Sequence, residues 1–164
     1  MQIEAPFERH REVVKPEWID HNGHLNVGFY VLAFDFATDA FLHWIGLDQP
    51  YREREDVTTF ALEGHITYQR EVKEGDHLRF STQLLGCDEK RIHYFHRMFS
   101  GEENYISATM ECLSLHVSRR TRRSAPIETN TLGKIEEILT SHKNLEIPHE
   151  VGRVMGLNSK TPTR

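Results

Sequence analysis

The feature that most constrains this chain is a long apolar run between Gly28 and Gly46, preceded directly by a cluster of polar residues. Four polar residues interrupt the run: Asp35, Thr38, Asp39 and His43. At about 100° per residue, these four fall within about 140° of arc on a helix. A helix that is apolar over the rest of its surface belongs in a protein core or a membrane, and two aspartates in so short a run argue against a membrane. The run therefore predicts a core helix that other elements must cover.

The composition is that of one globular domain. The chain has 164 residues, 38% hydrophobic and 27% charged, with a formal net charge of −5, which disfavours a general nucleic-acid binder. Two cysteines, Cys87 and Cys112, are too few for a disulfide framework, and residues 1–11 lack the apolar core of a secretory signal. We therefore expect a cytoplasmic protein with no membrane or nucleic-acid partner.

From Val57 the hydrophobic period changes from 3.6 to 2, which is typical of strands. The first strand is expected to be bulged at Gly64 and to have one apolar face: Phe60, Leu62, Gly64, Ile66 and Tyr68. Three more alternating runs follow between turn residues, at 78–84, 92–99 and 105–117. Tight turns between them predict an antiparallel meander of four strands. A shorter β-prone segment, His10–Lys15, is expected at a sheet edge.

One buried helix and four strands predict an α+β fold in which the sheet curls around the helix with its apolar face inward. Such a sheet leaves exposed edges, so we expect self-association. The main domain is expected to cover residues 1–125. Residues 126–164 would form a C-terminal extension of the same domain, with a helix at Thr131–Ser141 and a polar tail.

The polar cluster before the helix, Asp20–Asn26, predicts a site. One interpretation is structural, because the cluster is rich in turn formers and Asn26 can cap the helix. The other is catalytic, because free N–H groups and the positive end of the helix dipole near Val27 favour negative charge on an oxygen atom. His21 and His24 have no third ligand at a recognisable spacing, so we predict no metal.

The pattern Asp-x-x-Gly-His-x-Asn, followed by this helix and these strands, resembles the hotdog fold. In particular it is similar to the 4-hydroxybenzoyl-CoA thioesterase-like branch of the acyl-CoA thioesterases, over about residues 10–125. The matching residues are Asp20, Gly23, His24, Asn26 and Tyr30, with Tyr68 and the turn Glu74–Asp76 later in the chain.

The resemblance implies an activity and a set of site residues. Asp20 would act on the thioester as nucleophile or as general base, and the backbone at Gly23 and Val27 would contact the thioester. His24 and Asn26 would orient Asp20 or contact the acyl group. Active sites of this family lie between subunits, so the resemblance implies a homodimer or homotetramer with an acyl-CoA substrate and no cofactor.

The phosphates of CoA require positive charge near the mouth of the site. An arginine cluster at the end of the last strand is the main candidate, although such a run is often only a solvated surface: Arg119, Arg120, Arg122 and Arg123, with Arg70 and Lys73 behind it. Glu63 and His65 lie on the polar face of a strand that runs near the partner's site in hotdog folds. They would either contact the substrate or remain solvated.

Residues 16–26, with the sequence PEWIDHNGHLN, are similar to a narrower group, the thioesterases associated with carnitine dehydrogenase. Members of that group hydrolyse betainyl-CoA, whose acyl group carries a trimethylammonium cation. Such a cation binds aromatic faces, and Glu63 could balance its charge. The aromatic residues near the motif are Trp18, Phe29, Tyr30 and Tyr68.

Two other functions are compatible with a hotdog fold. A hydratase or dehydratase acting on acyl-CoA often has an Asp and a His separated by Asn-Pro, but Gly23 stands where that pattern has proline. A non-catalytic regulator would bind acyl-CoA and use the arginine cluster on nucleic acid. No helix-turn-helix segment is visible in the sequence, and the net charge is acidic, so both functions rank below thioester hydrolysis.

Overall fold

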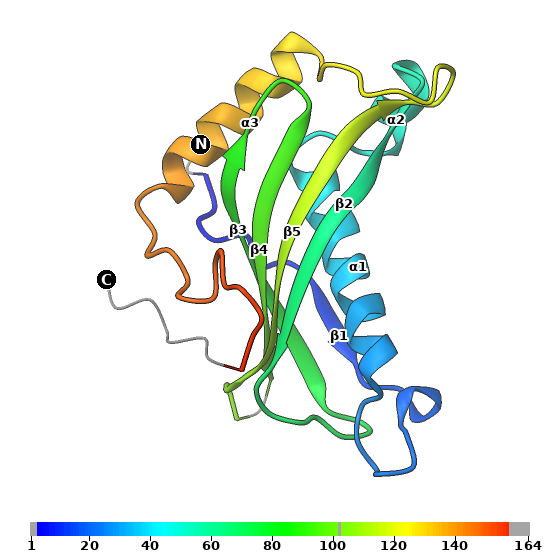
Figure 1. Cartoon of the computed structure of the whole chain (residues 1–164), viewed down its shortest axis with the longest axis vertical. Coiled ribbons are helices and arrows are strands. Elements are labelled where there is room, and N and C mark those ends of the chain that lie inside the picture. The colour runs from blue at the N-terminus through cyan, green and yellow to red at the C-terminus, as the bar shows by residue number, and fades with distance from the viewer. Residues whose placement is uncertain (1–2, 102, 158–164) are drawn as a thin grey trace.

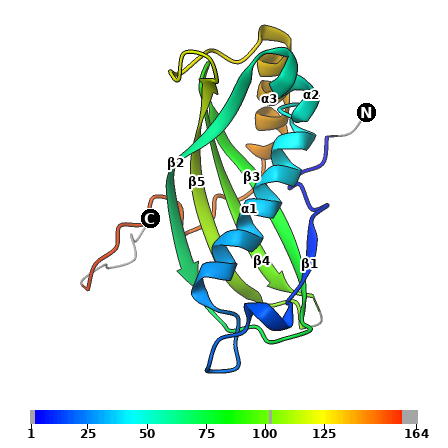
Figure 2. The same cartoon turned by 90° about the vertical axis from the view of Figure 1, so that its right-hand side faces the viewer.

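The computed structural model describes residues 3–101 and 103–157. A five-stranded antiparallel sheet curls along a long helix, α1 (Val27–Trp44), which lies across the concave face of the sheet (Figures 1 and 2). The strands are β1 (Arg11–Val13), β2 (Val57–Tyr68), β3 (His77–Cys87), β4 (Arg91–Ser100) and β5 (Ile106–Ser118). The predicted α+β fold with a sheet around a central helix is confirmed.

The strands follow the order β1-β3-β4-β5-β2 in the sheet. β3, β4 and β5 form the predicted meander, and β1 pairs with β3 at one edge as expected. The prediction that β2 continues this meander is wrong, because β2 pairs with β5 and forms the other edge. The segment after β2 turns away across the end of the sheet, where the Gln69 and Arg70 amides donate to the Ser107 carbonyl oxygen. Long-range pairing with β5 thus outweighs the local turn signal at residues 73–76.

The expected apolar face of β2 is also only partly correct. The register against β5 shifts between Ala61 and Glu63 rather than at Gly64. Because of this bulge, Phe60 lies opposite Leu115 on the outer face, whereas Gly64, Ile66 and Tyr68 face α1: their partners are Cys112, Met110 and Ala108. One extra residue reverses the side-chain alternation on either side of the irregularity.

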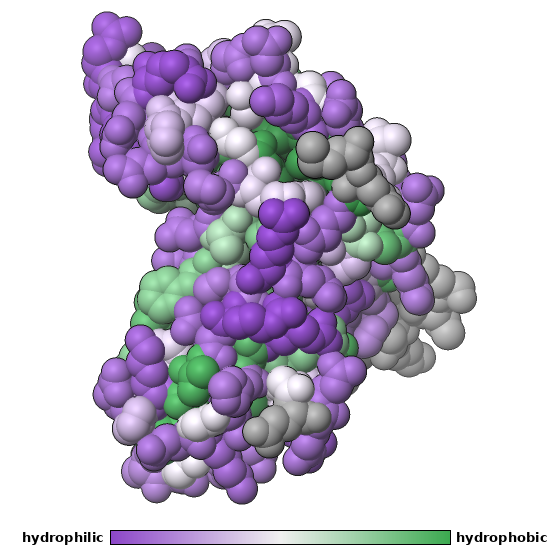
Figure 3. Space-filling view, turned by 180° about the vertical axis from the view of Figure 1, so that it is seen from behind, coloured by the Kyte–Doolittle hydropathy of each residue, from purple (hydrophilic) through white to green (hydrophobic). Residues whose placement is uncertain are grey.

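Helix α1 is a core helix along one side only. Phe34, Ala33, Ala37 and Phe41 are fully buried. The opposite side carries the exposed residues Val27, Val31, Asp35 and Asp39, which succeed one another every four positions. Seen from behind, the surface of the molecule is mostly hydrophilic and carries separate apolar patches (Figure 3). The exposed side of α1 is therefore apolar near the start of the helix and acidic further along.

Two further helices close the end of the sheet where α1 ends. Residues 48–56 are a polar connection with a proline, and within it Gln49–Arg54 forms α2, which Asp48 caps and whose Tyr51 is buried. Helix α3 (Thr129–His142) confirms the predicted C-terminal helix and packs on β3, where the Leu84 amide donates to His142 Nδ1. Residues 158–164 of the predicted polar tail lie outside the described residues, and the division at residue 125 stays a prediction.

Candidate active site

A closed loop holds the polar cluster at the start of α1. The loop leaves a short 3₁₀ turn, Pro16–Trp18, and closes where the Asn26 amide donates to the Trp18 carbonyl oxygen at 2.9 Å. Within it, the Asp20 amide donates to the His24 carbonyl oxygen, also at 2.9 Å. The Leu25 amide donates to the Val72 carbonyl oxygen and ties the loop to the segment after β2. The backbone around Asp20 is therefore fixed on two sides.

The Asp20 carboxylate has one oxygen engaged and one open. Its Oδ1 accepts from the Asn22 amide at 2.8 Å, which is the turn-forming role that the sequence allowed. Its Oδ2 has no hydrogen-bond partner among residues 3–101 and 103–157. Asp20 is half-buried, so this second oxygen is accessible to a bound substrate or water. The turn-forming and chemical roles are thus compatible in one side chain.

The first turn of α1 offers a free amide. Asn26 caps the helix, as predicted, because its Oδ1 accepts from the Gly28 amide at 2.9 Å. The Val27 amide has no acceptor in the described part of the chain, and Val27 is 60% exposed. A free N–H at the positive end of an 18-residue helix is suited to a substrate oxygen that gains negative charge.

The four aromatic residues near the loop have different surroundings. Trp18 is 3% exposed, stacks with Phe29 at 5.7 Å, and has the Lys15 ammonium 5.0 Å from its ring centre. Tyr30 is buried and meets Tyr68 edge to face at 5.2 Å, and burial raises the pKa of both phenols. Tyr68 is 51% exposed, so among the four it has the most open ring.

The remaining residues of the motif lie at the loop surface. Gly23 has a φ of +78°, a left-handed conformation that favours glycine, and Cβ-sized space beside it is open. His24 Nε2 lies 3.8 Å from a carboxylate oxygen of Glu71, a partner that the sequence analysis did not identify. No sequence signal distinguishes Glu71, because only the fold brings the segment after β2 to the loop.

The predicted arginine cluster lies far from Asp20 within one chain. The Arg119 amide donates to the Asp56 carbonyl oxygen beside the start of β2, whereas the Asp20 loop lies beyond the end of β2. Twelve strand residues separate the two positions, a span of roughly 40 Å. Arg70 lies nearer the loop, but its guanidinium pairs with Glu103 and stacks on Tyr105. A role for the cluster in the same site therefore requires a second subunit.

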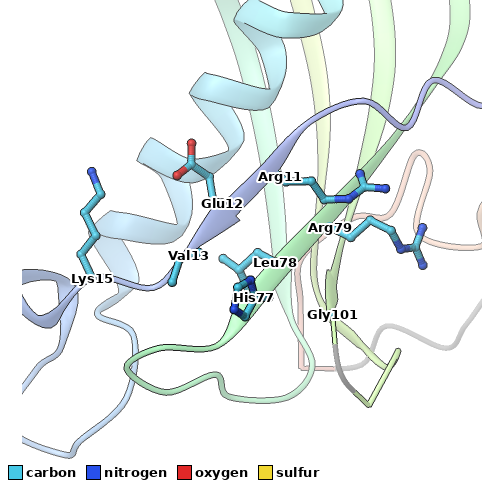
Figure 4. Close-up of a pocket in the computed structure, with 8 residues that line it drawn as sticks. All are labelled: Arg11, Glu12, Val13, Lys15, His77, Leu78, Arg79 and Gly101. Atoms are coloured by element: carbon cyan, nitrogen blue, oxygen red, sulfur yellow. The ribbon is translucent and has the colours of Figure 1, made fainter.

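A different basic surface lies at the β1 edge of the sheet. A groove of about 660 Å³ is lined there by Arg11, Glu12, Val13, Lys15, His77, Leu78, Arg79 and Gly101 (Figure 4). Arg11 and Arg79 are direct cross-strand partners and extend to the same side. Arg79 is already paired with Glu8 at 3.0 Å, and the Arg11 guanidinium donates to backbone carbonyls. These guanidinium groups mainly join the N-terminal segment to the sheet.

Glu63 and His65 belong to the middle of β2 and face away from the loop. Both line an outer-face groove of about 350 Å³ with His93 and Glu111, whose side chains approach to 2.7 Å. Within the described residues no group of three His, Cys, Asp or Glu side chains could hold a metal ion. In that same part of the chain, no helix is long and apolar enough to cross a membrane.

Comparisons with known proteins give the family. Residues 14–135 match the model of the thioesterase-like superfamily. A Pseudomonas aeruginosa betainyl-CoA thioesterase is 44% identical over 88% of this chain and 91% of its own length. An L-carnitine dehydrogenase/betainyl-CoA thioesterase of Rhizobium meliloti is 35% identical over 87% of this chain, which spans only 29% of that protein. A Staphylococcus aureus protein solved in complex with CoA is 27% identical, with a TM-score of 0.87 over 96% of this chain and 98% of the other.

The curled sheet, the central helix and the loop at its start define a thioesterase of the hotdog fold. The chain belongs to the thioesterase-like superfamily, and the predicted class of enzyme, a thioester hydrolase, is confirmed. The roles assigned to Asp20, His24, Asn26 and the other site residues stay predictions.

Proposed function

We propose that the protein hydrolyses a small acyl-CoA to the free acid and CoA, with betainyl-CoA as the first candidate. The observation that carries this is a half-buried carboxylate, Asp20, in the loop leading to a helix whose first amide, Val27, is free. The relative named for betainyl-CoA and the CoA complex of the structural neighbour support the substrate class. The two free cysteines agree with a cytoplasmic location, which stays a prediction.

The site supports two forms of the same hydrolysis. The thioester oxygen would accept from the Val27 amide, so that the helix end stabilises the tetrahedral oxyanion. In one form Asp20 attacks the carbonyl carbon and expels CoA thiolate, and water then hydrolyses the mixed anhydride. In the other, Asp20 takes a proton from the water that attacks the carbonyl, and the thiolate leaves with that proton. His24 and Asn26 would orient the carboxylate and the loop.

The aromatic residues would receive the acyl end. Tyr68 has the open face and Tyr30 supports it from the side, so a trimethylammonium group could rest on the Tyr68 ring. Phe29, the neighbour of Tyr30 in the chain, stacks on the buried Trp18. Glu63, in the middle of β2, faces away from the loop, so balancing the charge of the acyl group from there would require a second subunit.

A second copy of the chain would complete the site. β2 is an edge strand of twelve residues that pairs with β5 on one side and with no strand of the described residues on the other, and Phe60 is 60% and Leu62 46% exposed. The unpaired backbone groups of such an edge can form hydrogen bonds with a strand of a second copy. If two copies of β2 pair antiparallel, the start of one strand lies beside the end of the other. The partner subunit's Arg119, Arg120 and Arg122 would then approach the Asp20 loop and meet the phosphates of CoA, in a homodimer or a homotetramer built from it.

Asp20→Asn tests the chemistry. Asparagine keeps the oxygen that accepts from the Asn22 amide but loses the charge, so the loop should be retained. We expect at least a ~100-fold loss of turnover, the lower end of what a positioned acid or base contributes. The measurement is thiol release over a panel of acyl-CoAs that includes betainyl-CoA and crotonyl-CoA.

Asp88→Asn is the matched control, because Asp88 Oδ1 accepts from the Lys90 amide in the same kind of turn, in the β3–β4 connection. This variant should hydrolyse the panel like the wild type. Full activity of Asp20→Asn would contradict the assignment, and hydration of crotonyl-CoA without thiol release would favour a hydratase. Hydroxylamine would cleave the mixed anhydride, so a hydroxamate left on the Asp20 side chain after turnover would identify the nucleophilic form.

A further inference from the structure

Strand β2 forms one border of the sheet, and a single bulge divides it into two halves of similar length (Figure 2). The strand runs from Val57 to Tyr68, and its register against β5 shifts between Ala61 and Glu63. One extra residue reverses the two-residue alternation of a strand, both for the side chains and for the backbone groups. The two halves therefore differ in which residues point in each direction.

The side chains of β2 follow this reversal. In the first half, Thr58 and Phe60 lie on the outer face of the sheet, whereas in the second half Glu63, His65 and Thr67 do. The inner face, toward α1, carries the residues between them: Val57, Thr59 and Ala61 in the first half, and Gly64, Ile66 and Tyr68 in the second. Even-numbered residues thus face outward before the bulge, and odd-numbered residues face outward after it.

The backbone groups of β2 follow the same reversal. Before the strand, the Asp56 carbonyl oxygen accepts from the Arg119 amide, and after it the Gln69 amide donates to the Ser107 carbonyl oxygen. Alternate residues of an antiparallel strand direct their backbone groups to the same neighbour. In steps of two from Asp56 and from Gln69, the residues that point to β5 leave six that point to the free edge: Val57, Thr59, Ala61, Gly64, Ile66 and Tyr68.

We propose that two copies of the chain pair antiparallel along the full length of β2, with Val57 of one copy opposite Tyr68 of the other. This rests on the second copy in the proposed function and assigns the register in which the two strands meet. Outer side chains then lie opposite outer side chains, and inner opposite inner. All six residues with free backbone groups also find a partner of the same kind: Val57 with Tyr68, Thr59 with Ile66, and Ala61 with Gly64.

Other registers satisfy fewer of these groups. A displacement by one residue would place inner side chains opposite outer ones, and free backbone groups opposite groups already bonded to β5. A displacement by two residues matches the faces again, but leaves two of the six residues in each copy without a partner. The full-length register is therefore the one that pairs the most backbone groups at this edge.

The register also places the exposed Phe60 ring. The partner's Phe60 lies directly opposite His65 on the outer face, in a pair without backbone hydrogen bonds between its members, where side chains come closest. Phe60 is 60% exposed in the single chain, and His65 and Glu63 line the outer-face groove beside it. The second copy thus covers the apolar ring at the border of this groove.

The same register gives the arginine cluster a defined place in the shared site. One step beyond Val57, the partner's Asp56 comes opposite Gln69. The partner's Arg119, whose amide bonds to Asp56, then lies beside the segment that holds the Asp20 loop. The arginine cluster of one copy therefore reaches the loop of the other through the alignment of the two strands.

Disulfide cross-linking tests the register directly. The background is Cys87→Ser, in which the buried Cys112 is the remaining native thiol. Phe60→Cys combined with His65→Cys should run mainly as a covalent dimer on a non-reducing gel after mild oxidation. Directly opposite Cα atoms in such a pair are about 4.5 Å apart, which a disulfide can span. Positions 60 and 65 of one chain are roughly 17 Å apart, so the disulfide must join two copies.

Thr58→Cys with Thr67→Cys is a second pair that should cross-link. The matched controls exchange the partners: Phe60→Cys with Thr67→Cys, and Thr58→Cys with His65→Cys. Their cysteines are diagonal neighbours about 7–8 Å apart, so they should cross-link more slowly, and each single variant should run as one chain.

The outcomes separate the register from the activity. Faster cross-linking of an exchanged pair, a covalent dimer of any single variant, or no cross-link in variants that circular dichroism shows to be folded would overturn the register and leave the thioesterase intact. A wild type that releases thiol from no acyl-CoA would instead contradict the proposed function, while the cross-links still decide how β2 pairs.

Discussion

Single residues in the site have two tasks at once. Asp20 closes a turn through Oδ1 and leaves Oδ2 open, and Asn26 caps the helix whose first amide, Val27, stays free. These residues could be chosen from the sequence because turn formers and caps stand next to an apolar run. Glu71 could not be chosen in this way, because nothing in the sequence near Glu71 shows that the fold brings it to His24.

His96 is a buried base in the core between α1 and β3. It is fully buried and stacks on Phe34. Its two ring nitrogens form hydrogen bonds with the hydroxyl groups of Thr38, at 2.9 Å, and Thr82, at 2.8 Å. Burial lowers the pKa of His96 to about 3, so the imidazole is neutral in the folded protein at physiological pH. Its role is structural, since it joins the helix to the sheet.

The lowered pKa of His96 makes the stability of the folded protein depend on pH. The unfolded chain binds a proton at His96 below about pH 6.5, while the folded chain does not until about pH 3, so stability falls as the pH is lowered through this window. From pH 7 to pH 5 the free energy of unfolding should decrease by about 2 kcal/mol from His96 alone. His142 and His116, whose pKa values burial also lowers, add in the same direction.

Urea unfolding at the two pH values measures this decrease. His96→Gln, which keeps hydrogen-bonding capacity without a titrating group, should be less stable at pH 7 but lose about 2 kcal/mol less than the wild type on acidification. The same decrease in both proteins would show that His96 does not titrate as described.

The element that organises the fold is α1, whose buried side is almost entirely aromatic or small. Phe34 meets Phe80 at 5.8 Å with the rings nearly perpendicular, and Phe41 packs near Tyr94 at 5.3 Å. Ala33 and Ala37 are fully buried and allow the helix to approach the strands. The predicted core helix follows directly from this periodicity, since burial of such a surface is the main driving force for the element.

Phe34→Ala should destabilise the protein by about 3–5 kcal/mol, because it removes a fully buried ring and leaves a cavity against Phe80 and His96. Thermal or urea unfolding measures the change. Val31→Ala, one turn earlier at a position that is 44% exposed, should cost less than about 1 kcal/mol. Equal losses in the two variants would mean that α1 is not packed as described.

The strands show where local patterns stop being sufficient. The turn at Lys73–Asp76 exists, with Gly75 at a φ of +81°, yet it does not join two neighbouring strands. The bulge between Ala61 and Glu63 moves Phe60 to the outer face, although apolar and polar residues alternate without interruption in the sequence of β2. Both departures depend on pairing with β5, and Phe60 and its partner Leu115 are 55 residues apart in the chain, so no local signal contains that partner.

At the scale of the whole molecule, one chain leaves its site open. The free edge of β2 and the exposed side of α1 lie together, and the arginine cluster is at the end of β2 that is far from the Asp20 loop. A second copy paired along β2 would cover the apolar edge and bring the arginine cluster of each chain near the Asp20 loop of the other. The oligomeric state is therefore part of the catalytic proposal.

Phe60→Lys should separate the subunits, because it places a charge on the outer side of an edge strand at a position that is 60% exposed in the single chain. Sedimentation velocity should show a dimer or tetramer for the wild type and a shift toward monomer for the variant, with a parallel loss of thiol release. Ile147→Lys, exposed in the C-terminal segment, should leave both unchanged. A monomeric, fully active wild type would contradict the shared site.

The amino-acid sequence by itself determined the elements and the motif: an apolar helix behind a turn with a carboxylate, alternating strands, and a family resemblance carried by Asp20, His24 and Asn26. These depend on interactions between residues close in the chain, which periodicity and spacing record. Tertiary structure alone decided that β2 lies at the edge, that the bulge turns Phe60 outward, and that Glu71 lies beside His24. Those arrangements depend on the free energy of contacts between distant segments, and no short stretch of the sequence contains both partners of such a contact.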